Sequence, residues 1–459
     1  MATLIFFLII TLFSSSLTIT HQQQDPLLDS AEQDSVYQVL SSINPSISWR
    51  TLFPPDDFCF SPPHGVVCDY FIEENAAVSL HISELSFGYV SDYSPNPPCS
   101  SNSVLDPLLF TSFKYLRKLF FYKCFTEKAV LVPDVSKTAF GSSNLEELVF
   151  IENPALVGSV SGIIGNYTDL RRLVLSGNGV YGSIPDQIGD LVKNVEEITL
   201  SRNKLTGGFP FSLTKLKKLR VLDLGQNQFD GNVPDSVGNL SQLLKLDLSS
   251  NGFFGKIPEG MVNFQTLEFL DLSFNRFGNF GIPLFLGELS KLKEVYLSGN
   301  LLGGYIPEIW KNLGGVNAIG FSNMGLIGKI PGSMGVYLRN LSYLGLDNNK
   351  LEGEVPKELG FLEFVNEINL ENNSLSGEIP FTANFTARVG EKLKLNGNSK
   401  LCVIEGSLGK LKLCNRSDLL ADQVLFKEGS DYISSLSPSR QVSSSSLYGL
   451  MMVFYFLLW

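Results

Sequence analysis

The side chains that most often do chemistry are few in this chain and far apart. The three histidines are His21, His64 and His81, too scattered to supply a histidine-based metal centre or a Ser-His-Asp triad. Lysine and arginine number 35 against 46 aspartates and glutamates, a formal charge of −11. With no basic block, this acidic balance argues against nucleic acid and anionic membrane surfaces as partners. We therefore expect no enzyme activity, no metal site and no cofactor.

Cysteine thiols are the other reactive groups. No two of them have the spacing of a metal-binding CxxC motif, so an even number of cysteines in a secreted chain indicates disulfides. Several connectivities are possible, and the spacing favours three pairs: Cys59–Cys68, Cys99–Cys124 and Cys402–Cys414.

The start of the chain supports a secreted protein. An apolar run over residues 4–13 is too short to span a bilayer and is typical of a secretory signal, which we place at residues 1–20. A buried N-terminal strand is the alternative. In a secreted chain the N-x-[ST] sequons are candidate glycosylation sites. They lie at Asn166, Asn239, Asn340, Asn372, Asn384 and Asn415.

The C-terminal end carries a membrane signal. A serine-rich spacer over 416–446 precedes an apolar tail over 447–459. As a helix this tail would be roughly 20 Å long, against a hydrocarbon core of roughly 30 Å. A small residue, a polar spacer and a short terminal apolar tail form the signal for a glycosylphosphatidylinositol (GPI) anchor, and Ser435 fits best as the attachment residue. A short tail-anchoring helix is the alternative. Either way we expect the chain at the extracellular face of the plasma membrane.

A repeat fills the chain between these ends. Residues 145–388 divide into ten units of 24 or 25 residues with the pattern L-x-x-L-x-L-x-x-N-x-L-x-G-x-I-P, as in LRVLDLGQNQFDGNVP at 219–234. The L-x-L segment places two apolar side chains on one face of a short strand. The asparagine that follows can satisfy the backbone groups of the bend. Met324 occupies one asparagine position, which predicts a local irregularity.

No single unit can enclose a core, so neighbouring units must stack. The repeat therefore predicts an α/β solenoid with a parallel β-sheet on its concave face. Around it we expect an N-terminal cap at 21–77 with a helix over 30–43, and degenerate first repeats with a cysteine-containing insertion at 78–144. Within the latter, 78–90 reads as the first strand and 96–112 as a loop. We expect a C-terminal cap at 389–415.

The segments LTGGFP, LEGEVP and LSGEIP resemble the plant-specific class of leucine-rich repeats. Trp49 with DDFCFSPPHGVVCD (56–69), and LNGNSKLC (395–402) with Cys414, are similar to the caps of plant extracellular receptors. The kinase-free end resembles plant receptor-like proteins, in particular the Piriformospora indica-insensitive group. This resemblance implies a disulfide-capped superhelix that takes part in a response to a microbe, an endophyte or a pathogen.

The long concave sheet is a binding surface, because such solenoids generally offer one. Exposed aromatic side chains with flanking charges are typical interface anchors. The candidate ligand-binding residues are Phe269, Phe274, Tyr296, Tyr343, Arg220 and Lys245.

We expect a cell-surface receptor-like protein or co-receptor that binds a protein or peptide ligand. Because the chain has no kinase motifs, a transmembrane receptor kinase would be its second partner. The alternatives are a secreted inhibitor of microbial wall-degrading enzymes and an adhesion or scaffold protein. A terminal anchor makes the inhibitor less favoured.

Overall fold

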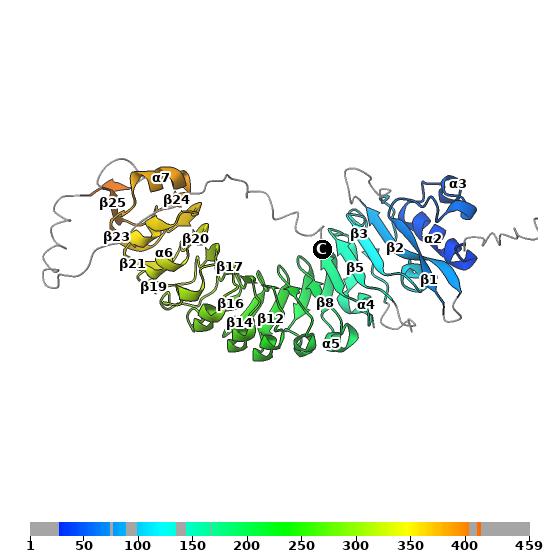
Figure 1. Ribbon diagram of the computed structural model, residues 1–459, viewed down its shortest axis with the longest axis horizontal. Coiled ribbons are helices and arrows are strands. Elements are labelled where there is room, and N and C mark those ends of the chain that lie inside the picture. Colours follow the sequence, from blue (N-terminus) through cyan, green and yellow to red (C-terminus); the bar gives the residue numbers. More distant parts are fainter. Residues whose placement is uncertain are drawn as a thin grey trace, which may run out of the picture. The chain divides into compact units, whose positions relative to one another are not determined.

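The computed structural model describes residues 27–73, 77–88, 99–134, 144–165, 167–403 and 411–414 (Figure 1). The chain divides into a first unit that ends at Lys412 and a short second unit from Leu413 onward, and the description below concerns the first. Several expected features lie outside the described residues: the signal peptide at 1–20, the spacer and apolar tail with Ser435, and the sequons Asn166 and Asn415.

One sheet of 14 strands runs through the described part of the first unit. All neighbouring strands pair in parallel except β1 and β2, which are antiparallel. The predicted parallel sheet is thus confirmed, whereas β1 ahead of residue 78 was not expected. The strands, in order, are β1 (Val66–Ile72), β2 (Val78–Gly88), β3 (Lys118–Tyr122), β5 (Glu147–Ile151), β7 (Arg172–Ser176), β9 (Glu197–Thr199), β11 (Val221–Asp223), β13 (Lys245–Asp247), β15 (Phe269–Asp271), β17 (Glu294–Tyr296), β18 (Ala318–Gly320), β20 (Tyr343–Gly345), β22 (Glu367–Asn369) and β24 (Leu393–Lys394).

The second extended segment of most repeats pairs into lateral sheets, and this pairing was not predicted from the sequence. One is β4 (Val130–Leu131), β6 (Leu156–Ser159), β8 (Gly179–Ser183), β10 (Lys204–Gly207), β12 (Gln228–Asn232), β14 (Gly252–Gly255) and β16 (Arg276–Phe277). The other contains β19 (Ile327–Gly328), β21 (Lys350–Glu354), β23 (Ser374–Glu378) and β25 (Lys400–Val403), and β26 (Lys412–Leu413) lies at the boundary of the two units.

The lateral sheets are interrupted between β16 and β19. Across this interval the β-pairing is reduced to the isolated bridges Gly278↔Leu301 and Tyr305↔Ile327, with further single main-chain hydrogen bonds such as Gly281 N to the Leu302 carbonyl at 3.0 Å. The repeat that starts the interval has one extra residue before its Ile-Pro, and Asn279 and Gly281 take positive φ angles of 64° and 75° there. The inserted turn ends the regular pairing.

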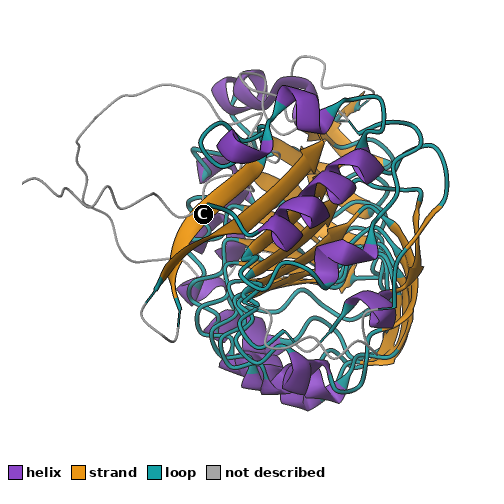
Figure 2. Ribbon diagram, turned by 90° about the vertical axis from the view of Figure 1, so that its right-hand side faces the viewer, coloured by secondary structure: helices purple, strands orange, loops and turns teal. Residues whose placement is uncertain are grey.

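Short helices occupy the side of each repeat away from the strands; Figure 2 shows them (purple) stacked together along one side of the array. The α-helices are α2 (Ser30–Ile43), α3 (Trp49–Leu52), α4 (Val160–Ile163), α5 (Ile188–Leu191), α6 (Ser333–Tyr337) and α7 (Ala383–Val389). The 3-10 helices are η1 (Pro55–Asp57), η2 (Pro107–Phe110), η4 (Phe211–Lys215), η5 (Asp235–Asn239), η6 (Glu259–Asn263), η7 (Leu284–Glu288), η8 (Trp310–Asn312), η9 (Lys357–Phe361) and η10 (Gly390–Lys392).

Two of the predicted segments can be compared directly with these elements. The helix expected over 30–43 is confirmed as α2, with Asp29 capping its first turn and its apolar face buried. The loop expected over 96–112 contains η2 in its described part, because Pro107 follows a capping Asp106.

The repeated asparagine forms a continuous hydrogen-bonded ladder under the sheet. Asn251 is typical: its Nδ2 donates to the Leu224 carbonyl at 2.9 Å and the Leu248 carbonyl at 3.2 Å, and its Oδ1 accepts from Phe229 N at 3.0 Å. At Met324 the ladder changes. The main-chain carbonyl of Met324 accepts from Gly303 N at 2.9 Å, and Asn349 Oδ1 accepts from both Met324 N and Leu326 N. Met324 is fully buried and adds only apolar packing.

Candidate binding surface

The outward-facing side chains of the main sheet form rows across the repeats. In β13, Lys245 and Asp247 flank the buried Leu246. The register places Lys245 between Val221 and Phe269 of the neighbouring strands. Each exposed strand position therefore continues into a row that crosses the concave face.

In the first repeats, basic and acidic side chains of one such row form ion pairs with one another. Lys118 lies 3.8 Å from Glu84, and Arg172 contacts both Glu147 at 3.2 Å and Glu197 at 3.0 Å. Glutamates and basic residues thus alternate along the row. Because these charges are already paired, this part of the face offers little to a charged ligand.

The middle of the face carries three aspartates in register, Asp223, Asp247 and Asp271. Lys245 Nζ lies 2.9 Å from Asp223 Oδ2. Burial, together with the charge of Asp223, raises the pKa of the Asp247 carboxyl to about 6, and burial also raises the pKa of Asp271. The hydroxyl of Ser249 donates to Asp247 at 2.7 Å. One lysine beside a row of three carboxylates leaves this region acidic, so it favours a positively charged ligand group.

Aromatic side chains continue from this acidic row. The ring centroids of Phe269 and Tyr296 are 5.9 Å apart, and Lys245 Nζ lies 5.4 Å from the Phe269 centroid. The Tyr296 hydroxyl donates to Glu294 at 2.9 Å, and burial raises the pKa of this phenol. The structure therefore brings Lys245, Phe269 and Tyr296 together on adjacent strands.

The other predicted ligand-binding residues lie around this group. Tyr343 is on β20, separated from Tyr296 by the small residues Ala318 and Gly320 of β18. Arg220 is exposed and immediately precedes β11; in the described part of the chain no ion pair involves it. Phe274 is not on a strand: it lies in the turn after β15.

Phe274 has an unusual backbone conformation. It is 62% exposed and has a φ of 52°, a left-handed conformation that is rare for a bulky residue. The same repeat position is glycine at 177, 299 and 397, and asparagine at 323, 348 and 372. Its ring lies against Gly299, where an added Cβ would come within 2.7 Å of it. The fold itself does not require phenylalanine here.

The N-terminal cap holds a polar cluster that the sequence analysis missed. Glu32 of α2 is only 8% exposed, and its Oε2 lies 2.7 Å from His81 Nδ1 on β2. The other ring nitrogen of His81 lies 3.1 Å from Glu73, which also accepts from the Tyr115 hydroxyl. Burial raises the pKa of Glu32. A cavity of about 430 Å³ adjoins these residues. Nothing in the spacing of these residues indicates that they meet.

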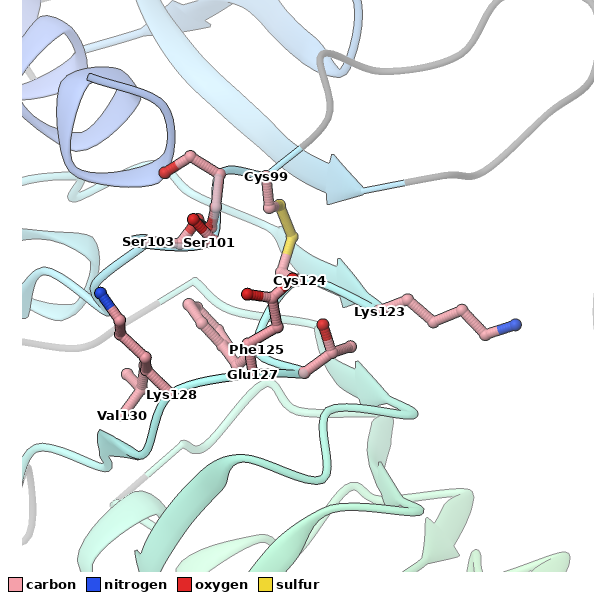
Figure 3. Close-up of a pocket in the computed structure, with 11 residues that line it drawn as sticks. Cys99, Ser101, Ser103, Lys123, Cys124, Phe125, Glu127, Lys128 and Val130 are labelled. Carbon is pink, nitrogen blue, oxygen red and sulfur yellow. Dashed lines mark hydrogen bonds between the residues drawn. A yellow bond between two sulfur atoms is a disulfide. The ribbon is translucent and has the colours of Figure 1, made fainter. Parts of the chain in front are cut away.

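Disulfides hold the flanks of the array. Cys59 bonds to Cys68 and Cys99 to Cys124, and Cys402 and Cys414 are also disulfide-bonded. Beside Cys124 lies a pocket of about 50 Å³, from which the Lys123 side chain extends away (Figure 3). Its volume suits water rather than a peptide, because ligand pockets measure roughly 300–1,000 Å³.

Two further properties concern metals and membranes. Among the described residues, no group of histidine, cysteine, aspartate or glutamate side chains is arranged to hold a metal ion. The helices of the same residues are all too short or too polar to cross a bilayer.

Four sequons fall within the described residues, and all four asparagines are exposed: Asn239, Asn340, Asn372 and Asn384. Asn372 has a φ of 56°, and its Nδ2 donates to Asn348 Oδ1 at 2.9 Å. This asparagine lies beside the concave face, directly before ladder residue Asn373. A glycan there would limit the ligand to earlier repeats.

Family models for leucine-rich repeats match residues 193–253, 291–313 and 340–362. The chain is 34% identical over 162 residues to Piriformospora indica-insensitive protein 2 of Arabidopsis thaliana, covering 35% of this chain and 36% of that protein. It is 35% identical over 160 residues to Protein TOO MANY MOUTHS of the same plant, covering 35% of this chain and 25% of that protein. The matched stretch thus spans about a third or less of these relatives.

Solved structures of other proteins share the fold of this chain. The TDR receptor is 26% identical with a TM-score of 0.51, covering 63% of this chain and 52% of that one. The Arabidopsis receptor kinase HAESA was solved with the peptide hormone IDA and the co-receptor SERK1. It is 26% identical with a TM-score of 0.51, and the match covers 67% of this chain and 58% of that one. A PEPR1–AtPEP1 structure is 23% identical with a TM-score of 0.60, and the match covers 83% of this chain and 54% of that one. At this identity it supports the fold alone.

Proposed function

We propose that this chain, a leucine-rich-repeat protein that resembles plant receptor-like proteins, binds a protein or peptide ligand on its concave face. It would act as a cell-surface receptor-like protein or co-receptor, by positioning partners and without chemistry of its own. The chain covers only part of each similar receptor, so ligand and partner are proposed from its own residues.

The observation that carries the proposal is the group formed by Lys245, Phe269 and Tyr296. Two aromatic rings, a lysine and the aspartate row meet on adjacent strands of an otherwise open sheet face. Half-exposed aromatic residues next to charges are typical hot spots of interfaces. We propose Tyr343, Phe274 and Arg220 as further ligand contacts.

The placement of the protein at the cell surface, with its anchor and its signalling partner, is also a proposal. Residues 1–20 would direct secretion, a GPI anchor at Ser435 would hold the chain at the outer leaflet, and a transmembrane receptor kinase would carry any signal across the membrane. A response to a microbe is the process suggested by the name of Piriformospora indica-insensitive protein 2.

The test compares ligand capture by the wild type and two variants. Peptides from plant extracellular fluid and fungal culture fluid are captured on the full chain, identified by mass spectrometry, synthesised and titrated by calorimetry. We expect Phe269→Ala and Tyr296→Ala each to weaken binding at least about tenfold, the effect of losing a hot-spot aromatic residue.

The matched control is Phe361→Ala, which removes an exposed phenylalanine of η9 on the helical side. It should bind as the wild type does. Captured peptides that bind the two concave-face variants with wild-type affinity would contradict the proposed site.

A further inference from the structure

A basic patch interrupts this acidic chain. Residues 193–220 contain seven lysines and arginines against two glutamates, although the formal charge of the whole chain is −11. One of the two glutamates, Glu197, is already paired with Arg172 at 3.0 Å. We define the basic patch as the exposed cations between α5 and β9 and between η4 and β11: Lys193, Lys217, Lys218 and Arg220. The net charge therefore conceals a local reversal of sign.

The repeat brings the four side chains of the basic patch together. Arg220 N donates to the Glu196 carbonyl at 2.7 Å, so the segments before β9 and β11 run in register. In this register Lys193 and Lys217 occupy the same position of neighbouring repeats. Lys218 reaches back across the repeat boundary, where its Nζ donates at 2.9 Å to the side chain that follows Lys193. The patch is therefore one surface shared by two repeats.

The two central lysines are held in place without being neutralised. Lys217 Nζ donates to the Asn239 main-chain carbonyl at 3.1 Å, and the acceptor of Lys218 is the amide oxygen of Asn194. Both acceptors are uncharged, whereas the neighbouring Lys215 lies 2.9 Å from an aspartate. In the described part of the chain no ion pair involves the four cations of the patch. Ammonium groups that are fixed but uncompensated suit an anionic ligand, because little further ordering is required on binding.

The neighbours of the basic patch favour a carbohydrate over a protein as the ligand. Protein interfaces are anchored by aromatic and apolar side chains. At the same positions of the flanking repeats the side chains are polar, namely Thr168, Asp169, Ser241 and Gln242. A linear polyuronate carries one carboxylate on each sugar and no apolar side chain. It can therefore pair with the lysines of successive repeats without an apolar contact.

Two other classes of polyanion fit less well. Three of the four cations are lysines, point charges that lack the planar fork with which arginine matches a phosphate. Nucleic acids and the anionic lipids of the cytoplasmic leaflet also lie inside the cell, and this chain is proposed to lie outside it. The choice of a polysaccharide thus rests in part on the proposed extracellular location, whereas the positive charge of the patch does not.

We propose that the basic patch binds a linear anionic polysaccharide of the polyuronate class. The carboxylates of neighbouring sugars pair with the three lysines, and Arg220 lies at the border with the concave face. At physiological ionic strength the repulsion from the acidic remainder of the chain is screened beyond about 8 Å, whereas contacts within the patch are shorter. A glycan at Asn239 would border the patch on the side of η5. The polymer thus adds to the proposed peptide binding without depending on it.

The test is a calorimetric titration of the full chain, purified in non-ionic detergent, with oligomers of polygalacturonate. EDTA is included so that calcium cannot bridge the carboxylates of the two molecules. The matched probe is the methyl ester of the same oligomers, which keeps the sugars and removes their charges. We expect the wild type to bind the acid and not the ester, and its affinity for the acid should fall at least about tenfold between about 50 and 300 mM salt.

Charge reversal locates the contact. Lys217→Glu combined with Lys218→Glu replaces two attractions by two repulsions, so affinity for the acid should fall at least about tenfold. The control is Lys291→Glu combined with Lys311→Glu, which changes the total charge equally. Lys291 occupies the repeat position of Lys218 three repeats later, and Lys311 lies on η8. The control should bind as the wild type does.

A wild type that does not bind the acid, or that binds the ester equally well, would overturn the proposal. Wild-type affinity of the Lys217→Glu, Lys218→Glu variant, or an equal loss in the control, would show that the patch is not the contact. Polyglutamate is titrated in parallel, and tighter binding to it than to the acid, lost in the same variant, would assign the patch to an acidic protein instead. No peptide ligand is added and the concave-face residues stay unchanged, so none of these results bears on the proposed ligand site.

Discussion

Asp247 is surrounded by groups that disfavour its charge. It is partly buried between Asp223 and Asp271, and among the described residues Ser249 alone donates to it, from its side chain and its main chain. Its pKa of about 6 lies above the ordinary value of 3.8. A carboxyl with a raised pKa destabilises the folded state where it is ionised, above pH 6, and this cost disappears as the pH falls toward 4.

Replacing Asp247 with asparagine should therefore stabilise the protein at pH 7. We expect a gain on the order of 1–3 kcal/mol, because each unit of pKa shift corresponds to about 1.4 kcal/mol. Urea unfolding at pH 7 and at pH 4 checks this, since the difference from the wild type should be lost at pH 4. An equal difference at both values would mean that the charge of Asp247 is not the cause.

Phe274 allows stability and binding to be separated. Asparagine tolerates the left-handed conformation and occupies the same position at 323, 348 and 372. Phe274→Asn should leave the unfolding midpoint unchanged or slightly higher, and should weaken ligand binding about tenfold. Thermal unfolding and calorimetry with the captured peptide measure the two effects. Unchanged affinity would remove Phe274 from the ligand site.

The asparagine ladder links the strands and turns of successive repeats. Asn275 is 7% exposed, donates to Leu248 and Leu272 carbonyls and accepts from Phe253 N. Each repeat therefore depends on its neighbour for the satisfaction of buried main-chain groups.

Asn275→Ala should lower the free energy of unfolding by about 2–4 kcal/mol, because it leaves several buried polar groups unpaired. Denaturant unfolding measures this, with Asn263→Ala as control, because Asn263 is exposed at the end of η6 and has an ordinary backbone conformation. A loss below about 0.5 kcal/mol, the usual size of a surface substitution, would contradict this role of the ladder.

The strands of the main sheet and the asparagine ladder could be predicted because the L-x-L segment and the asparagine after it each have a local reason for their conformation. The lateral sheets escaped prediction because two- to five-residue strands depend on pairing with the next repeat. The placement of Lys245, Phe269 and Tyr296 followed from alternation along strands. The contact of Glu32 with His81 joins α2 to β2 across 49 residues, and no local pattern encodes it.

At the scale of the whole molecule, the proposed lipid anchor determines how a signal would cross the membrane, because an anchored chain needs a transmembrane partner. We expect phosphatidylinositol-specific phospholipase C to release the chain from intact plant membranes, and deletion of residues 447–459 to give a secreted, soluble chain. Immunoblots of membrane and soluble fractions measure both. A chain that stays in the membrane fraction after the enzyme would favour a retained tail helix, and a freely soluble wild type would favour the secreted inhibitor.

The interruption of the lateral sheets between β16 and β19 affects more than the surface on which it lies. Over these repeats β17 and β18 continue the main sheet, but lateral pairing is reduced to two isolated bridges, and Met324 replaces a ladder asparagine. We therefore expect the array to bend most easily beneath the stretch of concave face that separates Tyr296 from Tyr343. Bending there would change the spacing of these two tyrosines, and with it the width of the ligand that we propose they contact.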